Sequence, residues 1–452
     1  MIQDMTYEEI VERISHLLEQ EKTNGIQVIL EELQPYDIAE IYVMLSEEQR
    51  PKFLDVLETE QQASLIEEID RDEQLELVEQ INVNDLGEVL DLMDNDDLAH
   101  LLDEVTPDVK EQYLSGMTTE ESTAVQKLME YEAETAGRIM TNRYVWIPEQ
   151  YTVRETVDKL KIFAEIAESI NYIYVINNEK QLMGVVSYRD LILAEMDEKI
   201  ADIMFSRVIS VPVEMDQEEV ASIIERYDFL AIPVVEENNV LVGIITVDDI
   251  IDVVIQEANE DIEKLSATGK SIDFDTKVWV ASYRRLPWLV LLLFVGLISG
   301  SIISQFEETL QKVVALSFFM PLISGMTGNT GTQSLAVVVR GIVGQEMNKA
   351  VVTRLILREF GVGALIGITC SILLFIIAYV WQGSLVLSFV VSSSLVFTLI
   401  IGTLAGTIIP LLLSKLKVDP AIASGPLITT LNDILSLLIY FKIATVFLHH
   451  LL

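Results

Sequence analysis

The chain has 452 residues, and charge is distributed very unevenly along it. Residues 1–283 carry 20 Lys and Arg against 65 Asp and Glu, a net charge of 20 − 65 = −45, whereas residues 284–452 carry 10 − 6 = +4. So negative a segment repels nucleic acid and attracts cations, and the single cysteine, Cys370, excludes an intramolecular disulfide framework and a thiolate metal cage. The N-terminus, MIQDMTYEEI, lacks the basic region and apolar core of a secretory signal. We therefore expect an acidic cytosolic part followed by a membrane part.

Residues 46–117 repeat with a period of twelve, beginning SEEQRPKFLDVL, ETEQQASLIEEI and DRDEQLELVEQI. Apolar residues hold the ninth and last places of each unit, and acids or capping residues open it. This pattern predicts one short helix per unit, stacked as a superhelical all-α solenoid. We assign residues 1–135 to this acidic domain, with most of its acids on a solvated face.

A second duplication follows the solenoid, and each half reads strand, helix, strand, strand, helix. The motifs GVVSYRD (184–190) and GIITVDD (243–249) stand where a strand turns into a helix. A hydroxyl and a carboxylate there can hold ribose, and the helix N-terminus favours phosphate. The pattern resembles the tandem cystathionine-β-synthase (CBS, or Bateman) domain, an α/β adenine-nucleotide sensor, with halves at 136–200 and 201–257. The alternative is a CBS pair whose cleft stays empty.

Beyond the duplication, an acidic connecting helix is expected at 258–284 and an all-α transmembrane domain of five helices at 285–452. Each of five apolar stretches is long enough for the roughly 20 residues that span a bilayer. They lie at 288–304, 313–337, 360–381, 385–412 and 422–448. Lys and Arg gather before the first stretch, after the second and, with Lys417, after the fourth. This distribution predicts cytoplasmic N-terminal domains and an outside C-terminus.

Two polar features interrupt the apolar stretches. The second stretch ends in PLISGMTGNTGTQSLAVVVRG, whose small residues suit either close helix packing or oxygen ligands for an ion. The fifth holds Asp433, and an acid within a membrane helix is a functional candidate by default. On a helix, Asp433 shares a face with Thr429, Thr430, Pro426 and Ile422.

The alternative for Asp433 is a buried ion pair with a base such as Arg340 or Lys442. Asp419, at the cytoplasmic mouth of the fifth stretch, reads first as a helix cap, although a carboxylate there could also recruit cations. Carboxylate and carbonyl-type oxygens without nearby His or Cys suit a hard cation such as Mg²⁺.

A helical solenoid, a CBS pair, a connecting helix and five spans in this order resemble the MgtE family of magnesium transporters over nearly the whole chain. The resemblance rests on GNTGTQ in the second span, DPAIASGPLITTLND in the fifth, and TVDDIIDVV with EANEDI after the second CBS half. It implies a homodimeric Mg²⁺ channel in the cell membrane, with a pore between the second and fifth spans. It also implies that Mg²⁺ bound to the acidic domains closes the pore, and that ATP occupies the CBS pair.

The resemblance and the residue arguments together predict three groups of site residues. The pore residues are Asp433, Asn329, Thr429, Gly328 and Asp419. Besides Asp433, the metal ligands are Asp216, Asp228, Asp249, Asp252, Glu257, Glu260 and Asp261, faced by solenoid acids Asp94, Asp96 and Asp97. The nucleotide contacts are Tyr172, Ser187, Arg189, Asp190 and Phe229.

Two other functions fit parts of the sequence. A membrane-anchored adenine-nucleotide sensor would use the spans only as an anchor, which leaves Asp433 and GNTGTQ without a purpose. A transporter of another divalent cation, Co²⁺ or Mn²⁺, is compatible with oxygen ligands. An enzyme is not expected, because the sequence has no phosphate-cradling Gly-Lys loop, zinc helix or nucleophile elbow. The expected partners are Mg²⁺, adenine nucleotide, membrane lipid and a second copy of the chain.

Overall fold

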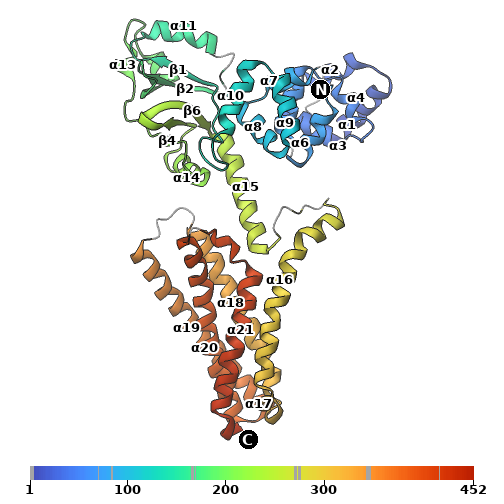
Figure 1. Cartoon of the computed structure of the whole chain (residues 1–452), viewed down its shortest axis with the longest axis vertical. Coiled ribbons are helices and arrows are strands. Elements are labelled where there is room, and N and C mark those ends of the chain that lie inside the picture. Colours follow the sequence, from blue (N-terminus) through green and yellow to red (C-terminus); the bar gives the residue numbers. More distant parts are fainter. Residues whose placement is uncertain are drawn as a thin grey trace. The chain divides into compact units, whose positions relative to one another are not determined.

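The computed structural model describes residues 5–69, 71–82, 85–163, 167, 169–268, 272, 276–342, 348–416 and 418–451. The chain forms two compact units, Met1–Val254 and Ile255–Leu452 (Figure 1). The first contains short helices and two small sheets, and the second is a bundle of long helices. Lys417, and residues 269–271 and 273–275 of the expected connecting helix, lie outside the described residues.

Short helices make up the first part of the N-terminal unit. They are α1 (Tyr7–Glu19), α2 (Thr23–Leu30), α3 (Pro35–Met44), α4 (Arg50–Leu54), α5 (Thr59–Glu68), α6 (Arg71–Gln80), α7 (Leu86–Leu92), α8 (Asn95–Glu104), α9 (Pro107–Gly116) and α10 (Thr119–Met129). Helices α4 to α9 fall one in each twelve-residue unit, which confirms that part of the prediction. Leu54, Val78 and Leu102, all at the ninth place, are at most 2% exposed. The superhelical course of these helices stays a prediction.

The polar residues that open these helices satisfy backbone groups that the first turn leaves free. Thr6 and Glu9 form a capping box at α1, and the Thr118 hydroxyl accepts a hydrogen bond from the Glu121 backbone N–H at α10. Pro107 occupies the first turn of α9, where its missing N–H costs nothing. Caps and apolar positions therefore recur together, which fixes where each short helix begins.

Two three-stranded sheets of the same design follow. The first half contains β1 (Tyr144–Pro148), α11 (Val153–Phe163), β2 (Ser169–Ile176), β3 (Leu182–Ser187), α12 (Tyr188–Leu193) and α13 (Ile200–Ile203). The second contains β4 (Val211–Pro212), α14 (Gln217–Tyr227), β5 (Ala231–Glu236), η1 (Glu237–Asn239), β6 (Val240–Thr246) and α15 (Val247–Ser266). In each sheet the first two strands are parallel and the last two antiparallel. The duplicated order of elements is as the sequence predicts.

The two halves share a hydrophobic core. Tyr174 and Leu182 of the first half pack in one buried cluster with Ala231 and Leu241 of the second. The Leu241 backbone N–H also donates to the Lys180 carbonyl at 3.0 Å. The pair is therefore one packed body, with the two strand-to-helix motifs at the starts of α12 and α15.

Five long helices and three short ones are described in the second unit beyond the end of α15. They are α16 (Val278–Gln305), α17 (Glu307–Lys312), α18 (Leu316–Ile342), α19 (Lys349–Gln382), α20 (Leu385–Lys415), η2 (Pro420–Ile422), α21 (Gly425–Val446) and α22 (Leu448–Leu451). Among the described residues, α16, α19, α20 and α21 are long and apolar enough to cross a membrane. Helix α18 covers the expected second span but is not among these four, because the polar run GMTGNTGTQ lies within it. A count of five spans thus stays a prediction.

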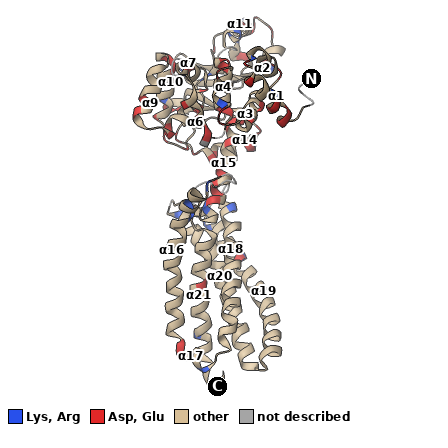
Figure 2. Ribbon diagram, turned by 90° about the vertical axis from the view of Figure 1, so that its right-hand side faces the viewer, with Lys and Arg blue, Asp and Glu red and all other residues tan. Residues whose placement is uncertain are grey.

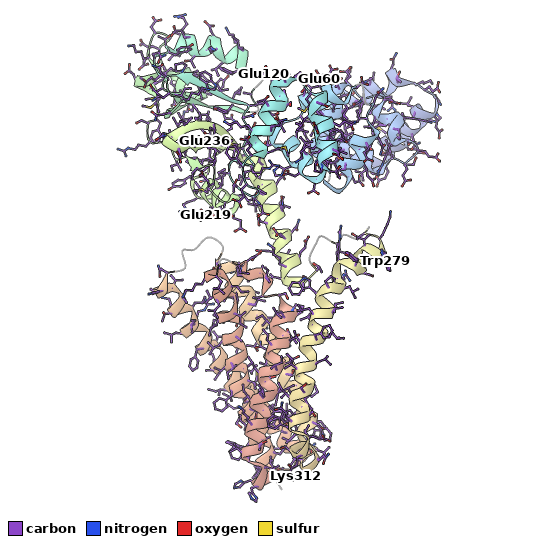
Figure 3. All side chains as sticks on the ribbon, viewed as in Figure 1. Glu60, Glu120, Glu219, Glu236, Trp279 and Lys312 are labelled. Carbon is purple, nitrogen blue, oxygen red and sulfur yellow. The ribbon has the colours of Figure 1, made fainter. Side chains whose placement is uncertain are left out.

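Charge separates the two units as the sequence indicates. Figure 2 shows Asp and Glu positions, in red on the ribbon, throughout the first unit and few along the long helices. Figure 3 labels Trp279, in the first turn of α16, and Lys312, at the end of α17, near opposite ends of the second unit. Trp279 is 82% exposed, which is typical of an aromatic residue that sits at a membrane interface.

Glycines bring α18 into direct backbone contact with α20 and into close contact with the Asn432 side chain of α21. A Cβ placed on Gly406 of α20 would lie 2.1 Å from the carbonyl oxygen of Gly331 on α18. A Cβ on Gly331 would lie 2.0 Å from the side-chain nitrogen of Asn432 on α21. Small residues allow such close approach of membrane helices. The polar run in α18 therefore packs between two neighbouring helices.

Candidate functional site

Asp433 lies on α21 and faces α18. The Ser324 hydroxyl of α18 donates a hydrogen bond to its carboxylate. Among the described residues Asp433 forms no ion pair, so the alternative of a pair with Arg340 or Lys442 is not realised there. The carboxylate is half-buried rather than enclosed. An acid with one neutral partner and an open side is suited to bind a cation.

Two further polar contacts join the same helices. The Asn432 side chain is fully buried and donates to the Thr327 carbonyl at 3.4 Å. The hydroxyls of Thr332 and Thr429 lie 3.3 Å apart. These contacts hold α18 and α21 in register beside Asp433.

The predicted pore residues on α18 divide between two faces. Gly328 is buried against Thr429, where a Cβ would lie 2.8 Å from the threonine methyl group. Asn329 and Gln333, one turn apart, are exposed on the other face. On α21 the shared face holds Pro426, Thr429, Thr430 and Asp433. Ile422 was wrongly included, because it lies in η2, before α21 begins at Gly425.

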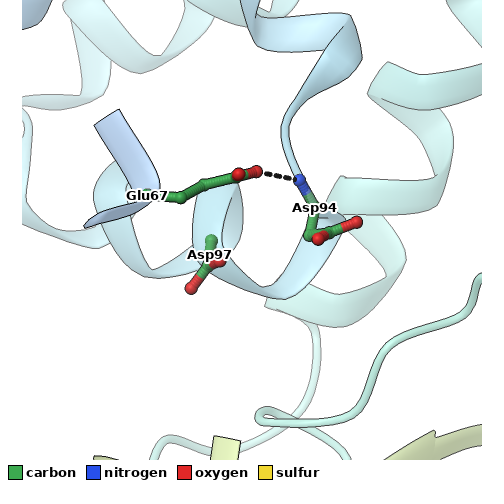
Figure 4. Close-up of side chains that lie close together, drawn as sticks. All are labelled: Glu67, Asp94 and Asp97. Carbon is green, nitrogen blue, oxygen red and sulfur yellow. Dashed lines mark hydrogen bonds between the residues drawn. The ribbon is translucent and has the colours of Figure 1, made fainter. Parts of the chain in front are cut away.

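A cluster of three acids lies in the first unit. Carboxylate oxygens of Glu67, Asp94 and Asp97 all lie within 4.8 Å of one another (Figure 4). The Asp94 backbone N–H donates to Glu67 at 2.7 Å, and Arg143 forms an ion pair with Asp94 at 3.4 Å. Sequence reasoning predicted Asp94 and Asp97 and missed Glu67, which follows the buried core residue Ile66 on α5. The predicted Asp96 is buried on α8 and is not in the cluster.

Burial raises the pKa of several acids around this cluster. It raises the pKa of Glu67 to about 7 and that of Asp94 in the same direction. It also raises the pKa of Asp249 to about 6, although hydrogen bonds from Thr246 oppose the shift and the negative charges of Asp248 and Asp94 add to it. The Thr246 hydroxyl donates to Asp249 at 2.5 Å at the start of α15. The acids of the solenoid and of the second CBS half are therefore close enough to repel one another.

The donor set of this cluster fits a hard divalent cation. Its ligand atoms are carboxylate oxygens, which Mg²⁺ and Ca²⁺ prefer over softer metals. Glu67, Asp94 and Asp97 would hold the ion, and its charge would offset their mutual repulsion.

A second acidic group lies near the end of α15, within the other unit. The Lys264 ammonium is 2.5 Å from a carboxylate oxygen of Glu260 and 2.5 Å from one of Asp419. Burial opposes the lysine charge, but these two contacts outweigh it and raise the pKa of Lys264. Burial and the charge of Asp419 raise the pKa of neighbouring Asp261. Asp419 also accepts from the Ala421 backbone N–H at 2.8 Å, so its expected capping role is confirmed.

The other predicted metal ligands are more scattered. Asp216 and Asp228 are exposed at opposite ends of α14, where the helical rise separates them by roughly 18 Å. They cannot ligate one ion together within a chain. Asp252 is exposed and Glu257 half-buried on α15.

Most predicted nucleotide contacts gather at the first strand-to-helix motif. Tyr172 on β2 stands opposite Ser187 on β3. The Ser187 hydroxyl donates to Asp190 at 2.6 Å, and Arg189 is exposed beside them on α12. Phe229 comes from the second half, where its ring stacks on Tyr227 with centroids 5.4 Å apart. Next to the capping box of α12, the Arg189 guanidinium and the Asp190 carboxylate are therefore exposed to solvent.

Known families match most of the chain. Residues 33–134 match the MgtE intracellular N domain, and residues 136–197 and 200–256 match the CBS domain. Residues 320–443 match MgtE, described as a divalent cation transporter. The α18 segment with GNTGTQ and the α21 segment with Asp433 both lie inside this last match.

Relatives match over the full length. The chain is 62% identical over 451 residues to the magnesium transporter MgtE of Bacillus subtilis (strain 168), covering 100% of both chains. It is 42% identical over 329 residues to the magnesium transporter MgtE of Thermus thermophilus, covering 72% of each.

Two solved structures resemble the first unit. One is the soluble part of a magnesium transporter, with 37% identity and a TM-score of 0.54 over 56% of this chain and 100% of that one. The other is the cytosolic domain of the Mg²⁺ channel MgtE in complex with ATP, with 34% identity and a TM-score of 0.52 over 54% and 99%. The family match over residues 320–443 and a relative 62% identical over the whole length establish that the chain belongs to the MgtE family of divalent cation transporters.

Proposed function

We propose that this chain forms a homodimeric channel or transporter that imports Mg²⁺ across the cell membrane. The observation that carries the proposal is Asp433, a half-buried acid on α21 with no basic partner among the described residues, beside the polar run of α18. The relatives with full or two-thirds coverage are named magnesium transporters. The second copy would bring a second Asp433 to the same path, on the side that carries Asn329.

The two Asp433 carboxylates, one from each copy of the chain, would suit a hydrated ion. Mg²⁺ gives up its water reluctantly, so a carboxylate and amide oxygens that contact its hydration shell suit it better than a closed cage. Ser324 supplies a neutral oxygen to Asp433, and Asn329 offers an exposed amide oxygen on the other face of α18. Oxygen ligands also accept Co²⁺ and Mn²⁺, so the selectivity must be measured.

The test is Mg²⁺ influx into liposomes that contain the purified full-length chain. Asp433→Asn keeps the size of the side chain and its capacity to accept from Ser324, but removes the charge, so we expect influx to be lost or sharply reduced. Asp419→Ala is the matched control, because it removes an acid outside α21 and should have a smaller effect. Normal influx through Asp433→Asn would make Asp433 a structural residue and leave the channel proposal without support.

We further propose that cytosolic Mg²⁺ closes the pore. Without a cation, half-buried acids such as Glu67, Asp94 and Asp249 repel one another. Neutralising that repulsion favours a compact arrangement, and the helix that carries Glu257, Glu260 and Asp261 then closes the mouth near Asp419. A ligand shifts such an equilibrium only by its differential affinity for the two states, so several weak sites would act together.

This gating proposal predicts that single neutralisations shift the closing Mg²⁺ concentration modestly. Asp249→Asn combined with Asp252→Asn and Glu257→Gln should leave the pore open at concentrations that close the parent. The measurement is flux against Mg²⁺ on the cytosolic side, together with protease sensitivity of the full-length chain. If the triple variant closes at the parent's concentration, these acids are only a solvated face.

The remaining features complete the proposal. Five spans, cytoplasmic N-terminal domains with a superhelical solenoid, and an outside C-terminus follow from the apolar stretches and the basic residues. ATP binding at the first CBS motif is supported by the ATP complex of a similar cytosolic domain. It would act as a regulatory ligand, because transport rather than catalysis is the family's activity.

A further inference from the structure

Glu359 is a buried acid within the bundle of long helices. It lies on α19 and is 4% exposed, the only buried acid that the structure describes in the second unit. One carboxylate oxygen accepts from the Ser334 hydroxyl of α18 at 3.0 Å. The other accepts from Nε and Nη2 of Arg358 at 3.1 and 2.8 Å. An acid so placed costs free energy unless its hydrogen bonds serve the structure.

The Ser334 hydrogen bond connects α18 and α19, which also meet where the Trp381 ring of α19 contacts the rings of Phe318 and Phe319 near the start of α18. Helix α18 packs along α20 and α21, and α19 packs along α20. Ser334 follows Gln333 directly, at the cytoplasmic end of the polar run. Glu359 therefore attaches α19 to α18 at the height where α18 also contacts α21 through Thr332 and Thr429.

Large apolar side chains of α18, such as Phe319 and Leu335, are buried before and after the polar run. Within the run itself the buried residues are small, so the local orientation of the helix depends on polar contacts. At Gly331 and Gly406 backbone meets backbone, without large interlocking side chains that would fix rotation about the helix axis. Interhelical hydrogen bonds then specify the register. On the α21 side these bonds come from Ser324 and Thr332. On the α19 side the bond that the structure describes comes from Ser334.

We infer that Glu359 is a positioning residue for ion conduction, which acts through Ser334 to hold α18 with Asn329 and Ser324 in their places beside the ion path. The inference rests on the proposed transport function. Glu359 itself faces the buried side of α18, opposite the exposed Asn329, so it does not contact the ion. A bond between a hydroxyl and a carboxylate is stronger than one between neutral groups, which explains an acid at this position.

The experiment compares influx of Mg²⁺ and of Co²⁺ into liposomes with the purified full-length parent, Ser334→Ala, Glu359→Leu, the double variant and Glu359→Gln. Ser371→Ala is the matched control, because Ser371 is another buried residue of α19 and its hydroxyl has no partner among the described residues. The ratio of the two fluxes is the main readout, because a loss of folded protein lowers both fluxes equally and leaves the ratio unchanged. Thermal unfolding in detergent records stability separately.

We expect Ser334→Ala and Glu359→Leu each to change the flux ratio by about threefold, the factor that corresponds to an average interhelical hydrogen bond. The double variant should show about the same threefold change, because both substitutions remove one link. Glu359→Gln, whose amide oxygen still accepts from Ser334 through a weaker neutral hydrogen bond, should change the ratio less than Glu359→Leu does, and Ser371→Ala should stay near the parent.

Three results would overturn the inference. They are a parent-like ratio in Ser334→Ala, a roughly ninefold change in the double variant, and a Glu359→Gln variant as impaired as Glu359→Leu. The last would mean that the charge of Glu359 acts on the ion directly. A parent chain that carries no Mg²⁺ would instead refute the proposed function, so the two failures are distinguishable.

Discussion

Acidification from pH 8 to pH 6 is expected to weaken Mg²⁺ binding at the cluster of Glu67, Asp94 and Asp97. The reason is that burial raises the pKa of Glu67 to about 7 and that of Asp249 to about 6. A carboxyl group must lose its proton before it can ligate a cation, so protons compete with Mg²⁺ in this pH range.

The size of the expected loss in Mg²⁺ affinity follows from the pKa values of Glu67 and Asp249. A group with a pKa of about 7 weakens binding by a factor of about 11 at pH 6 and about 1.1 at pH 8, a ratio of about ten. A group with a pKa of about 6 adds a ratio of about two. Asp249 is outside the cluster, but the charge of Asp94 raises its pKa. If the bound ion requires Asp249 to be ionised together with Glu67, affinity falls about twentyfold. At pH 7 binding should release about 0.6 protons, mostly from Glu67.

The raised pKa of Glu67 also predicts how the stability of the cation-free protein depends on pH: stability should fall as the pH rises. Because the folded pKa of Glu67 is raised, its stabilising proton is fully bound below its ordinary value of 4.5 and is lost as the pH rises through about 7. The difference corresponds to about 3 kcal/mol for this group. Without Mg²⁺, the first unit should therefore unfold more easily at pH 8 than at pH 5.

The assay is calorimetric titration of the full-length protein in detergent with Mg²⁺ at pH 6, 7 and 8. Buffers of different ionisation enthalpy give the number of protons released. Glu67→Gln should reduce the pH effect from about twentyfold to about twofold. Glu68→Gln is the control, a neighbouring acid of α5 that is exposed and is not in the cluster. If binding releases no protons, or if Glu67→Gln keeps the full pH effect, the cluster does not bind Mg²⁺ in the way argued.

Three other substitutions test separate parts of the structure. Gly406→Ala would press a methyl group against the carbonyl of Gly331 and should lower the stability of the helix bundle by about 1 to 3 kcal/mol in thermal unfolding, whereas Gly361→Ala, which meets open space, should be neutral. Lys264→Met removes an ammonium that competes with cations for its two carboxylate partners. Closure should therefore need less Mg²⁺ in flux assays, and a shift to higher Mg²⁺ would contradict the competition. Arg189→Ala should weaken ATP binding in calorimetry, and a parent that is silent at millimolar ATP would remove the nucleotide proposal.

Features that depend on residues close together in the sequence could be predicted from the sequence. The twelve-residue period gave one helix per unit because its apolar places recur at a spacing that a short helix can bury. The Ser187 to Asp190 and Thr246 to Asp249 spacings predicted helix starts because a side chain three residues away can reach the backbone of the cap. Asp433 was identified because an acid in an apolar run has no structural purpose that the sequence alone supplies.

Residues whose purpose depends on distant partners were missed. Glu67 joins Asp94 across 27 positions, and nothing around it distinguishes it from the many exposed acids of the solenoid. Glu359 follows Arg358 at the start of an apolar run, where an acid is typical of a solvated helix end, and its partner Ser334 lies 25 positions away. Lys264 also resembles an ordinary basic residue in an acidic helix. The role of each of these residues could be identified only once the packing of the helices was known.

The polar run of α18 has a consequence for how the chain enters the membrane. A described helix of 18 or more residues lies at each of the five expected spans. Of these helices, α18 is the one that is not apolar enough to be a candidate membrane span. Its polar partners lie far along the chain, since Asn432 bonds Thr327 across 105 positions and Asp433 bonds Ser324 across 109. At about 5–20 residues per second the ribosome needs roughly 5–20 s to make that length. During that interval α18 depends on the insertion machinery to remain in the bilayer until α20 and α21, against which it packs, arrive.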